Sequence, residues 1–420
     1  MLRTLFLIPH EFLGLPVFGI GWALVLLVAL IALRCLVAVR RGSGLTNTLQ
    51  SEGLLWGIFA FVVVVVLPKV ELTNLDNEPV GMAIRGYGVM LLIAIASAVA
   101  LAAYRAKRRD VDPEIIFSMA PFAFVGGIFG ARLFFVIQYW EQFVGETAFE
   151  TLANMMRFTE GGLVVYGSFI GGFLAVAYFV YRNQLSMLKM GDIIIPCLFL
   201  GLFFGRIGCL FNGCCYGGRC EDANYALHFP PKSPVYERQL STGELIGFQF
   251  DKESKQVTRV EGDSLAAKSG IRAGGTLQSM GNDLSYLAVA SRELPAEQAL
   301  PGFLIDIDGQ RYRWSPEELP ARALPVYPAQ LISSLSGLCM CIFLCVLSSF
   351  SMKDGMLMMF GFSAYALLRF GLEIVRVDEL GQFGTGLSIS QIVSLVVLIL
   401  SVAGAVWIKT FRSGKELQGS

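Results

Sequence analysis

Charged side chains are scarce in this sequence: Asp, Glu, Lys and Arg make up 16% of the residues, against about 25% in a typical soluble protein. Hydrophobic residues account for 55%. So few charges cannot cover a soluble surface of this size, and much of the chain must face lipid. An excess of one sign is also lacking, since 33 basic residues balance 33 acidic ones, so nothing indicates a nucleic-acid partner. We predict an all-α protein that crosses the membrane several times.

Histidine is also scarce, and His10 and His228 are its two occurrences. The H-E-x-x-H pattern of a membrane metalloprotease is therefore absent, and a serine–histidine protease would lack its intramembrane histidine. No C-x-x-C pair occurs, so a thioredoxin-like exchange site lacks its usual form. Inverted repeats, which many transporters contain, are not detectable. These absences exclude the proteases and argue against the commonest transporter architectures.

Nine apolar stretches are long enough, at about 20 residues, to cross a membrane as helices. They lie near residues 14–36, 52–70, 82–104, 115–138, 162–181, 190–211, 329–350, 355–376 and 388–408. Met1–His10 lacks a basic segment followed by a small-residue cleavage site, so we expect the first span to stay as an anchor.

Basic residues mark the loops that we expect on the cytoplasmic side. They follow the first, third, fifth, seventh and ninth spans: Arg34, Arg40, Arg41, Arg105, Lys107, Arg108, Arg109, Arg182, Lys189, Lys353, Lys409, Arg412 and Lys415. The opposite short loops, at 71–81 and 377–386, are acidic. The N-terminus is therefore predicted outside and the C-terminus, with a tail at 411–420, inside.

One outward loop, from about residue 212 to 327, is too long for a simple connector. Within it we predict strands at Val257–Val260 and Thr276–Met280, and a capped short helix in Gly262–Gly270. This order resembles the central segment of a PDZ domain, in which Leu245–Phe248 would be the peptide-carboxylate loop. A small β-rich insert without peptide binding is the alternative.

Ionisable residues inside the spans are costly and usually functional. Five arginines and one glutamate fall in the predicted outer half of the membrane: Arg85, Arg132, Arg206, Arg369, Glu373 and Arg376. Each arginine can instead reach the interface or pair with a carboxylate such as Glu373 or Glu160. The surplus of guanidinium groups nevertheless favours an external anion, and a phospholipid phosphate is the anion available at that depth.

Small residues and tyrosines accompany these arginines. Gly126, Gly127 and Gly130 lie in the fourth span, and a glycine-rich run, 160–172, enters the fifth. Close helix packing is the simpler interpretation of most of these glycines. Tyr87 and Tyr166 differ, because a hydroxyl at membrane depth needs a hydrogen-bond partner.

The most distinctive stretch is Gly205-Arg-Ile-Gly-Cys-Leu-Phe-Asn-Gly-Cys-Cys-Tyr-Gly217. It resembles the G-R-x-G-N-F-x-N-G-E-x-x-G signature of prolipoprotein diacylglyceryl transferases. Further segments resemble that family in the same order: Arg85–Gly88, Gly130–Arg132, Glu160–Gly167, Tyr327–Gln330, and the Y-x-x-x-R-x-x-x-E-x-x-R run from Tyr365 to Arg376. The similarity covers residues 80–228 and 324–409.

The resemblance implies a bacterial inner-membrane enzyme with about seven family-type spans, at 81–228 and 324–410. A two-span extension (1–80) precedes this core, and an extracytoplasmic insert (229–323) interrupts it. Such enzymes transfer diacylglyceryl from phosphatidylglycerol to the lipobox cysteine of secreted preprolipoproteins, forming a thioether and releasing glycerol-1-phosphate. No cofactor and no metal is expected.

The resemblance also assigns roles to residues. Arg206 and Arg369 are the expected phosphate ligands and, with Tyr87 and Tyr166, the expected catalytic residues. The remaining expected substrate-binding residues are Arg85, Arg132, Asn212, Gly217, Gln330, Tyr365, Glu373 and Arg376.

Three positions depart from the family pattern. The fifth-span histidine, often proposed as the base, is Tyr166, while the Asn and Glu of the signature are Cys209 and Cys214. A tyrosine with a pKa near 10 is a poor base at neutral pH. We therefore expect Tyr166 to orient substrate while arginines lower the pKa of the incoming thiol. A non-catalytic protein of this fold, which binds or transports anionic phospholipid, is the alternative function.

Four cysteines form a C-x4-C-C-x4-C pattern at the predicted outer face: Cys209, Cys214, Cys215 and Cys220. A disulfide is one interpretation, because that compartment is oxidising. Unlinked thiols and a metal site are the others, although the spacing does not fit a zinc ribbon.

Overall fold

The computed structural model describes residues 4–40, 45–145, 147–156, 162, 164–220, 224–289, 295, 299–375 and 387–411. Glu160, Arg376 and the tail beyond residue 411 lie outside these ranges. The chain divides into two compact units, one of residues 1–89 with 208–327 and the other of 90–207 with 328–420.

Helices dominate the described chain. Their bounds are α1 (Trp22–Arg40), α2 (Leu45–Phe61), the π-helical η1 (Val62–Val66), α3 (Leu67–Val70), α4 (Gly86–Arg108), α5 (Pro113–Gln138), η2 (Trp140–Gln142), α6 (Ala148–Met155), α7 (Val165–Arg182), α8 (Met187–Asn212), α11 (Ala329–Leu347), α12 (Met356–Val375) and α13 (Ile389–Phe411). Eight stretches of the described chain are long and apolar enough to cross a membrane. The fifth predicted span, 162–181, corresponds to α7, which is not among those eight. The prediction of a mostly helical, polytopic membrane protein is confirmed.

The first predicted span begins too early. Residues 11–16 form a short hairpin of β2 (Glu11–Phe12) and β3 (Leu15–Pro16), and the indole N–H of Trp22 donates to the Phe12 carbonyl at 2.7 Å. Helix α1 therefore starts at Trp22 rather than near residue 14. Hydropathy alone could not separate this apolar hairpin from the apolar helix that follows it.

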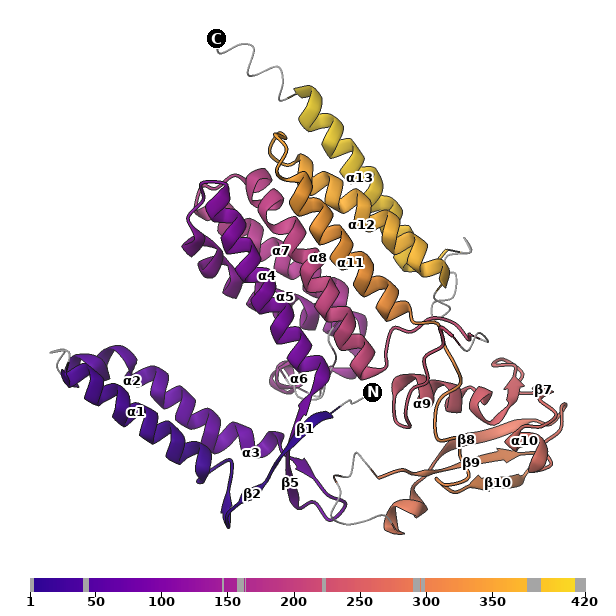
Figure 1. Cartoon of the computed structure of the whole chain (residues 1–420). Helices are drawn as coiled ribbons and strands as arrows, with labels where there is room; N and C mark the ends of the chain where they lie inside the picture. Colours follow the sequence, from indigo (N-terminus) through magenta and orange to yellow (C-terminus); the bar gives the residue numbers. More distant parts are fainter. Residues whose placement is uncertain are drawn as a thin grey trace. The chain divides into compact units, whose positions relative to one another are not determined.

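A small sheet ties the N-terminus to the start of α4. Strand β1 (Thr4–Pro9) pairs antiparallel with β5 (Pro79–Arg85), and β4 (Leu72–Thr73) pairs with the other edge of β5. The partner of Thr4 is Arg85. In the sequence, α1 and the segment from α2 to α3 lie between β1 and β5. Because these two strands pair, the helices form a hairpin that leaves the small sheet and returns to it (Figure 1).

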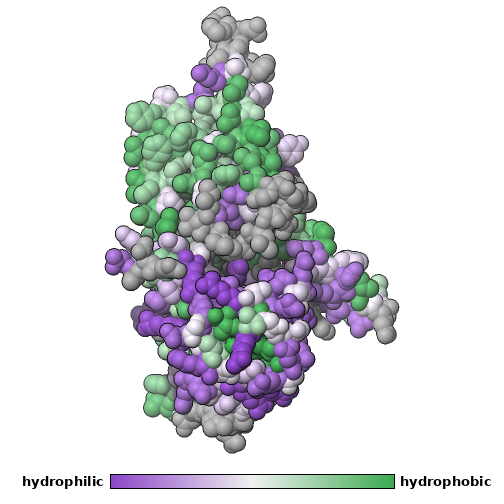
Figure 2. Space-filling model, turned by 90° about the vertical axis from the view of Figure 1, so that its right-hand side faces the viewer, coloured by the Kyte–Doolittle hydropathy of each residue, from purple (hydrophilic) through white to green (hydrophobic). Residues whose placement is uncertain are grey.

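The helices of the second unit enclose two apolar clusters. One joins α4, α5, α7 and α8 through residues such as Ala106, Ile116, Val180 and Ile193. The other joins α8, α11 and α12 through Phe199, Leu344 and Leu357. Outward-facing positions are also apolar, and Figure 2 shows hydrophobic residues over the helices but mainly hydrophilic ones over the insert. This pattern is that of a bundle surrounded by lipid.

Helices α5 and α7 meet backbone to backbone along a glycine seam, which we define as Gly126, Gly130, Gly167 and Gly171. A methyl group on Gly130 would lie 2.3 Å from the Gly167 carbonyl oxygen, and one on Gly171 would lie 2.2 Å from the Gly126 carbonyl oxygen. The packing interpretation of these glycines is confirmed, since no side chain larger than hydrogen fits here.

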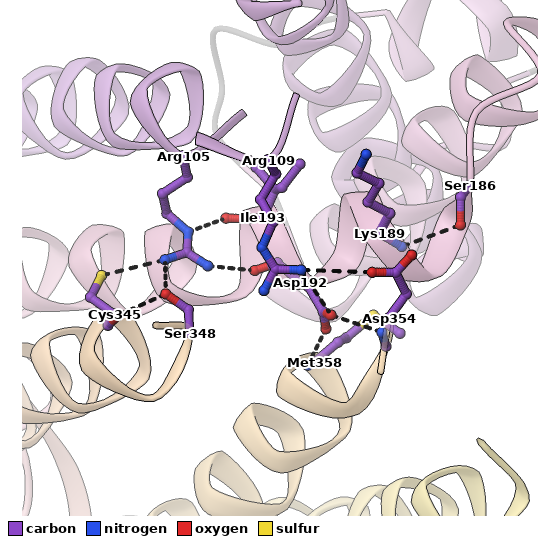
Figure 3. A network of polar contacts seen from close by, with 11 residues as sticks. Arg105, Arg109, Ser186, Lys189, Asp192, Ile193, Cys345, Ser348, Asp354 and Met358 are labelled. Atoms are coloured by element: carbon purple, nitrogen blue, oxygen red, sulfur yellow. Dashed lines mark hydrogen bonds and ion pairs between the residues drawn. The ribbon is translucent and has the colours of Figure 1, made fainter. Parts of the chain in front are cut away.

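A polar network joins the end of α4, the start of α8, the end of α11 and the start of α12 (Figure 3). Arg105 on α4, 6% exposed, donates to the carbonyls of Ile193 and Asp192 at 3.0 and 2.9 Å and to the Ser348 hydroxyl at 3.0 Å. The fully buried Asp192 carboxylate accepts the backbone N–H groups of Gly355 and Met358, both at 2.8 Å. This Arg105–Asp192 network therefore fixes α4 and α8 against the α11–α12 turn.

The insert has its own hydrophobic core, which includes Phe229, Ile246, Phe248, Ile305 and Trp314. Its elements are α9 (Pro234–Ser241), η4 (Glu244–Ile246), β6 (Phe248–Phe250), β7 (Val257–Val260), α10 (Leu265–Lys268), β8 (Leu277–Asp283), η5 (Leu284–Val289), β9 (Gly302–Ile307) and β10 (Gln310–Trp314). Strands β6 and β7 form a hairpin, while β10, β9 and β8 form an antiparallel sheet in that order. Both predicted strands and the short helix, capped by Ser264, are confirmed.

Candidate active site

Arg369 lies at the centre of a polar cluster in the second unit. Its Nη1 contacts the Glu373 carboxylate at 2.7 Å, one turn further along α12. The Glu373 side chain is 4% exposed and that of Arg369 15%. The carboxylate therefore holds the guanidinium in one orientation while part of Arg369 stays accessible.

Ser390 connects this pair to the fifth predicted span. Arg369 Nη2 donates to the Ser390 hydroxyl at 2.7 Å, and the Tyr166 hydroxyl lies 3.2 Å from the same oxygen. Tyr166 is 43% exposed, whereas Ser390 is 3% exposed. We call Tyr166, Arg369, Glu373 and Ser390 the Arg369–Ser390 network. It brings together two residues, Tyr166 and Arg369, that the sequence places far apart.

Backbone carbonyls hold the Arg132 guanidinium. Its Nε donates to the Met155 carbonyl at 2.9 Å, and its Nη atoms donate to the carbonyls of Gly162 and Asn154, each at 3.3 Å. The guanidinium also lies over the rings of Phe135 and Phe143. With 6% exposure, Arg132 fixes the end of α6 and the chain before α7.

Arg206 has the opposite surroundings. It lies on the last turns of α8 and is half-buried, and none of the described residues forms a hydrogen bond or ion pair with it. Tyr365, on α12, packs edge-to-face against Phe199 with ring centroids 6.2 Å apart. Gln330 is fully buried near the start of α11. Arg206, which has no ion-pair partner among the described residues, is suited to bind an anionic ligand.

The end of α8 contacts the start of α4 in the first unit. A methyl group on Gly86 would lie 3.1 Å from Phe211 Cβ, so the segment with Arg85 and Tyr87 lies next to Phe211 and Asn212. Tyr87 is 42% exposed. Asn212 also lines a cavity of about 30 Å³ with Phe229 and Ser233. That cavity holds about one water molecule and is too small for a lipid headgroup.

Gly217 helps to close the insert. Its N–H donates to the Tyr327 carbonyl at 3.0 Å, and the Tyr327 N–H donates to the Gly218 carbonyl at 2.9 Å. Cys220 N–H donates to the Pro325 carbonyl at 2.9 Å. The chain entering the insert therefore pairs with the chain leaving it, and both ends are held beside the loop that follows α8.

Three of the four clustered cysteines converge. The sulfur atoms of Cys209, Cys214 and Cys215 all lie within 4.8 Å of one another, and each side chain is half-buried. Cys220 is buried and is not part of this group.

Two residues important to these networks have no place in the sequence predictions. Asp192 lies inside the sixth predicted span, and its acidic character among apolar residues is the signal that could have revealed it. Ser390 begins a polar series on α13 with Ser394 and Ser401. Serines are common enough in membrane helices that this spacing alone does not identify a site.

These features define a multi-pass membrane protein with ionisable groups buried among its helices, the usual mark of a functional site in a membrane. The family model for prolipoprotein diacylglyceryl transferase matches residues 78–407. The chain therefore belongs to the prolipoprotein diacylglyceryl transferase family.

Named relatives agree with this assignment. The phosphatidylglycerol–prolipoprotein diacylglyceryl transferase of Rhodopirellula baltica is 44% identical over 434 residues, which cover 96% of this chain and 88% of the relative. Its counterpart in Clostridium tetani is 35% identical over 140 residues, covering 33% of this chain and 54% of the relative. That of Gloeobacter violaceus is 36% identical over 137 residues, covering 33% and 49%. The first match extends over the N-terminal helices and the insert as well as the core.

Proposed function

We propose that this protein transfers the diacylglyceryl group of phosphatidylglycerol to the lipobox cysteine of prolipoproteins. A thioether forms and glycerol-1-phosphate leaves, so the reaction is a step of lipoprotein maturation. The observation that carries this proposal is the 44% identity to the Rhodopirellula baltica transferase along nearly the whole chain.

Arg369 and Arg206 are the proposed phosphate ligands. Arg369 is oriented by Glu373 and Ser390 at 2.7 Å each, which leaves the rest of its planar fork for a phosphate. Arg206 has no ion-pair partner in the described chain. Arginines aimed at the leaving phosphate stabilise the charge that it gains as the bond to carbon breaks, and this electrostatic effect is usually the largest in such reactions.

Other residues position the substrate or the site. Tyr166, through Ser390, belongs to the same network as Arg369, which supports an orienting role for its hydroxyl. Tyr87, Arg85 and Asn212 are proposed to bind substrate where α4 meets α8. Arg132 is proposed to shape the site rather than bind phosphate, because three carbonyls already accept its N–H groups.

The remaining assigned residues complete the proposed site. Gln330, Tyr365, Glu373 and Arg376 are proposed to line it from α11 and α12 and from the chain that follows α12, with Arg376 lying outside the described residues. Gly217 is proposed to hold the loop after α8 through its bond to Tyr327.

The proposed location is the bacterial inner membrane, with the N-terminus outside, the C-terminus inside and the active site toward the outer leaflet. The distribution of Lys and Arg between the loops supports this orientation. Fusing a reporter that is active on one side only to each terminus tests it, and equal signals from the two ends would contradict it.

The insert, residues 229–323, is proposed to be PDZ-like and to recruit preproteins. Strand β7, the capped α10 and strand β8 follow one another in the order that the resemblance to PDZ domains predicts, which supports this proposal. Deleting residues 240–322 should narrow the range of preproteins that are modified. An unchanged range would contradict the recruiting role and leave the transferase proposal intact.

The decisive test of function uses purified full-length protein, phosphatidylglycerol vesicles and a lipobox peptide. We expect a peptide whose mass has increased by one diacylglyceryl group, and no product from the same peptide with serine in place of cysteine. Vesicle binding without any thioether product would instead support a non-catalytic anionic-phospholipid-binding or transport protein of the same fold.

A further inference from the structure

The cysteine cluster lies within Gly205–Gly217, the stretch that resembles the family signature. Cys209 and Cys214 occupy positions where the family pattern has Asn and Glu, and Cys215 follows directly. Their three sulfur atoms lie within 4.8 Å of one another. Thiols therefore stand at the end of α8 where the family pattern has an amide and a carboxyl side chain.

The backbone is folded to bring these sulfurs together. Helix α8 ends at Asn212, and Gly213 takes a left-handed conformation with φ of +74°. The N–H groups of Gly213 and Cys214 both donate to the Cys209 carbonyl, at 2.9 and 3.1 Å. Cys215 is also left-handed, with φ of +58°, which is uncommon for a residue with a side chain. The turn thus directs two thiols back toward the last turn of the helix.

Three converging cysteines form a ligand set for a soft metal ion. Sulfur atoms around a tetrahedral Zn²⁺ lie about 2.3 Å from the ion and hence about 3.8 Å from each other. Small changes in the side-chain torsion angles are enough to bring sulfurs that lie within 4.8 Å of one another to that spacing. In the described chain no fourth Cys, His, Asp or Glu joins the three. Three protein ligands with one open position are typical of catalytic rather than structural zinc.

We propose that Cys209, Cys214 and Cys215 bind one Zn²⁺ ion, whose fourth position receives the sulfur of the prolipoprotein cysteine. This proposal rests on the proposed function, because it concerns the thiol which that reaction alkylates. A thiol that coordinates zinc is held as its thiolate. The sequence spacing argued against a zinc ribbon, and the folded turn supplies a different, three-cysteine arrangement.

The reaction balances with the ion in this role. The lipobox thiol releases its proton to solvent on binding Zn²⁺. Its sulfur then forms a bond to the glyceryl carbon of phosphatidylglycerol as the bond from that carbon to the phosphate oxygen breaks. The electron pair leaves with glycerol-1-phosphate, which carries one more negative charge than the phosphodiester, and the neutral thioether dissociates. No external base is required at the moment of transfer.

This assignment explains two departures together. The fifth-span histidine of the family is Tyr166 here, and the chain has two histidines in total, His10 and His228. The matched position therefore has no imidazole, while three thiols appear in the stretch from Gly205 to Gly217. Arg206 precedes Cys209 by three residues on α8, so a phosphate ligand and a metal ligand share one face of that helix.

The first experiment measures metal in purified full-length protein, stripped with a chelator, reduced and reloaded with Zn²⁺ or Cd²⁺. We expect one ion per chain and, with Cd²⁺, a thiolate-to-metal charge-transfer band. Cys209→Ser, Cys214→Ser or Cys215→Ser should weaken binding about 100-fold or more. Cys214→His should retain the ion, because histidine is also a zinc ligand. Cys339→Ser, an exposed cysteine on α11, is the matched control and should change nothing.

The second experiment separates this proposal from the function on which it rests. A lipobox peptide with cysteine should add a fourth sulfur to the Cd²⁺ coordination shell, measured by X-ray absorption, whereas the serine peptide should not. Chelation should lower transfer about 100-fold or more, as expected for loss of the group that deprotonates the nucleophile, and Zn²⁺ should restore it.

Three results would overturn the proposal: reduced protein that binds no Zn²⁺, full transfer by the metal-stripped protein, or a disulfide within the cluster in the active enzyme. If no preparation transfers diacylglyceryl, the proposed function fails. The metal content of the protein and the sulfur that the peptide adds to the Cd²⁺ coordination shell still show whether the zinc site exists.

Discussion

Two arginine networks in the same helical unit differ in how completely protein atoms surround them. In the Arg105–Asp192 network the guanidinium is 6% exposed and donates to two carbonyls and a hydroxyl, and the carboxylate accepts two backbone N–H groups. In the Arg369–Ser390 network the Arg369 side chain is 15% exposed and Tyr166 is 43% exposed. The first network has its partners within the protein and holds helices together. The second is oriented yet accessible, as a binding site must be.

The strongest test of this contrast is Arg369→Lys. Lysine keeps the positive charge beside Glu373 but loses the planar fork that binds phosphate through two bonds. We expect the transfer rate to fall by about 100- to 1000-fold, while the melting temperature changes little. Arg219→Lys, at an exposed ion pair in the first unit, is the control. Near-normal transfer by Arg369→Lys would remove this residue from the reaction.

Asp192→Asn tests the closed network. An amide offers one oxygen where the carboxylate offers two, so its NH₂ group must face the N–H of Gly355 or Met358. We expect the free energy of unfolding to fall by about 2–4 kcal/mol, with transfer per folded molecule unchanged. Denaturation in detergent measures the loss, and Asp354→Asn, at the exposed edge of the network, should change stability far less. A fully stable but inactive variant would reverse the roles assigned to the two networks.

Tyr166→Phe has a smaller expected effect. The substitution removes the hydroxyl that contacts Ser390 but keeps the ring, and we expect transfer to fall about tenfold because substrate is less well oriented. Steady-state rates at several lipid concentrations measure it. Unchanged activity would exclude a role for the hydroxyl, whereas complete loss would make it chemically essential rather than orienting.

Ser390→Ala should have the smallest effect of the four. Arg369 keeps its 2.7 Å contact with Glu373 and loses only the hydroxyl that links it to Tyr166. We therefore expect about a fivefold decrease in transfer. Combining it with Tyr166→Phe should add little, because both changes break the same link. Fully additive losses would show that Tyr166 and Ser390 act independently.

The sequence predicted helices and arginines better than it predicted partners. Apolar runs identified the spans because hydropathy extends over about 20 residues. Residues 14–21, which include the end of the β2–β3 hairpin, continue the apolar run of α1 and therefore fall in the first predicted span. Arg369 and Glu373, four residues apart on one helix, were predictable as neighbours. Their contact with Ser390 was not, because it depends on how α12 packs against α13. In the sequence, Arg132 looks like Arg369, since each is an arginine within an apolar span. The backbone carbonyls that accept the Arg132 N–H groups could not be predicted, because every residue has a carbonyl.

The glycine seam has a mechanical consequence. Along the seam, backbone meets backbone and no side-chain layer separates α5 from α7 that could slide or compress. We therefore expect the two helices to move together. Gly130 precedes Arg132 by two residues, and Gly167 follows Tyr166 directly, so the seam also sets the heights of these two side chains relative to each other. Any opening that admits a lipid tail must therefore occur at another helix boundary and leave this pair intact.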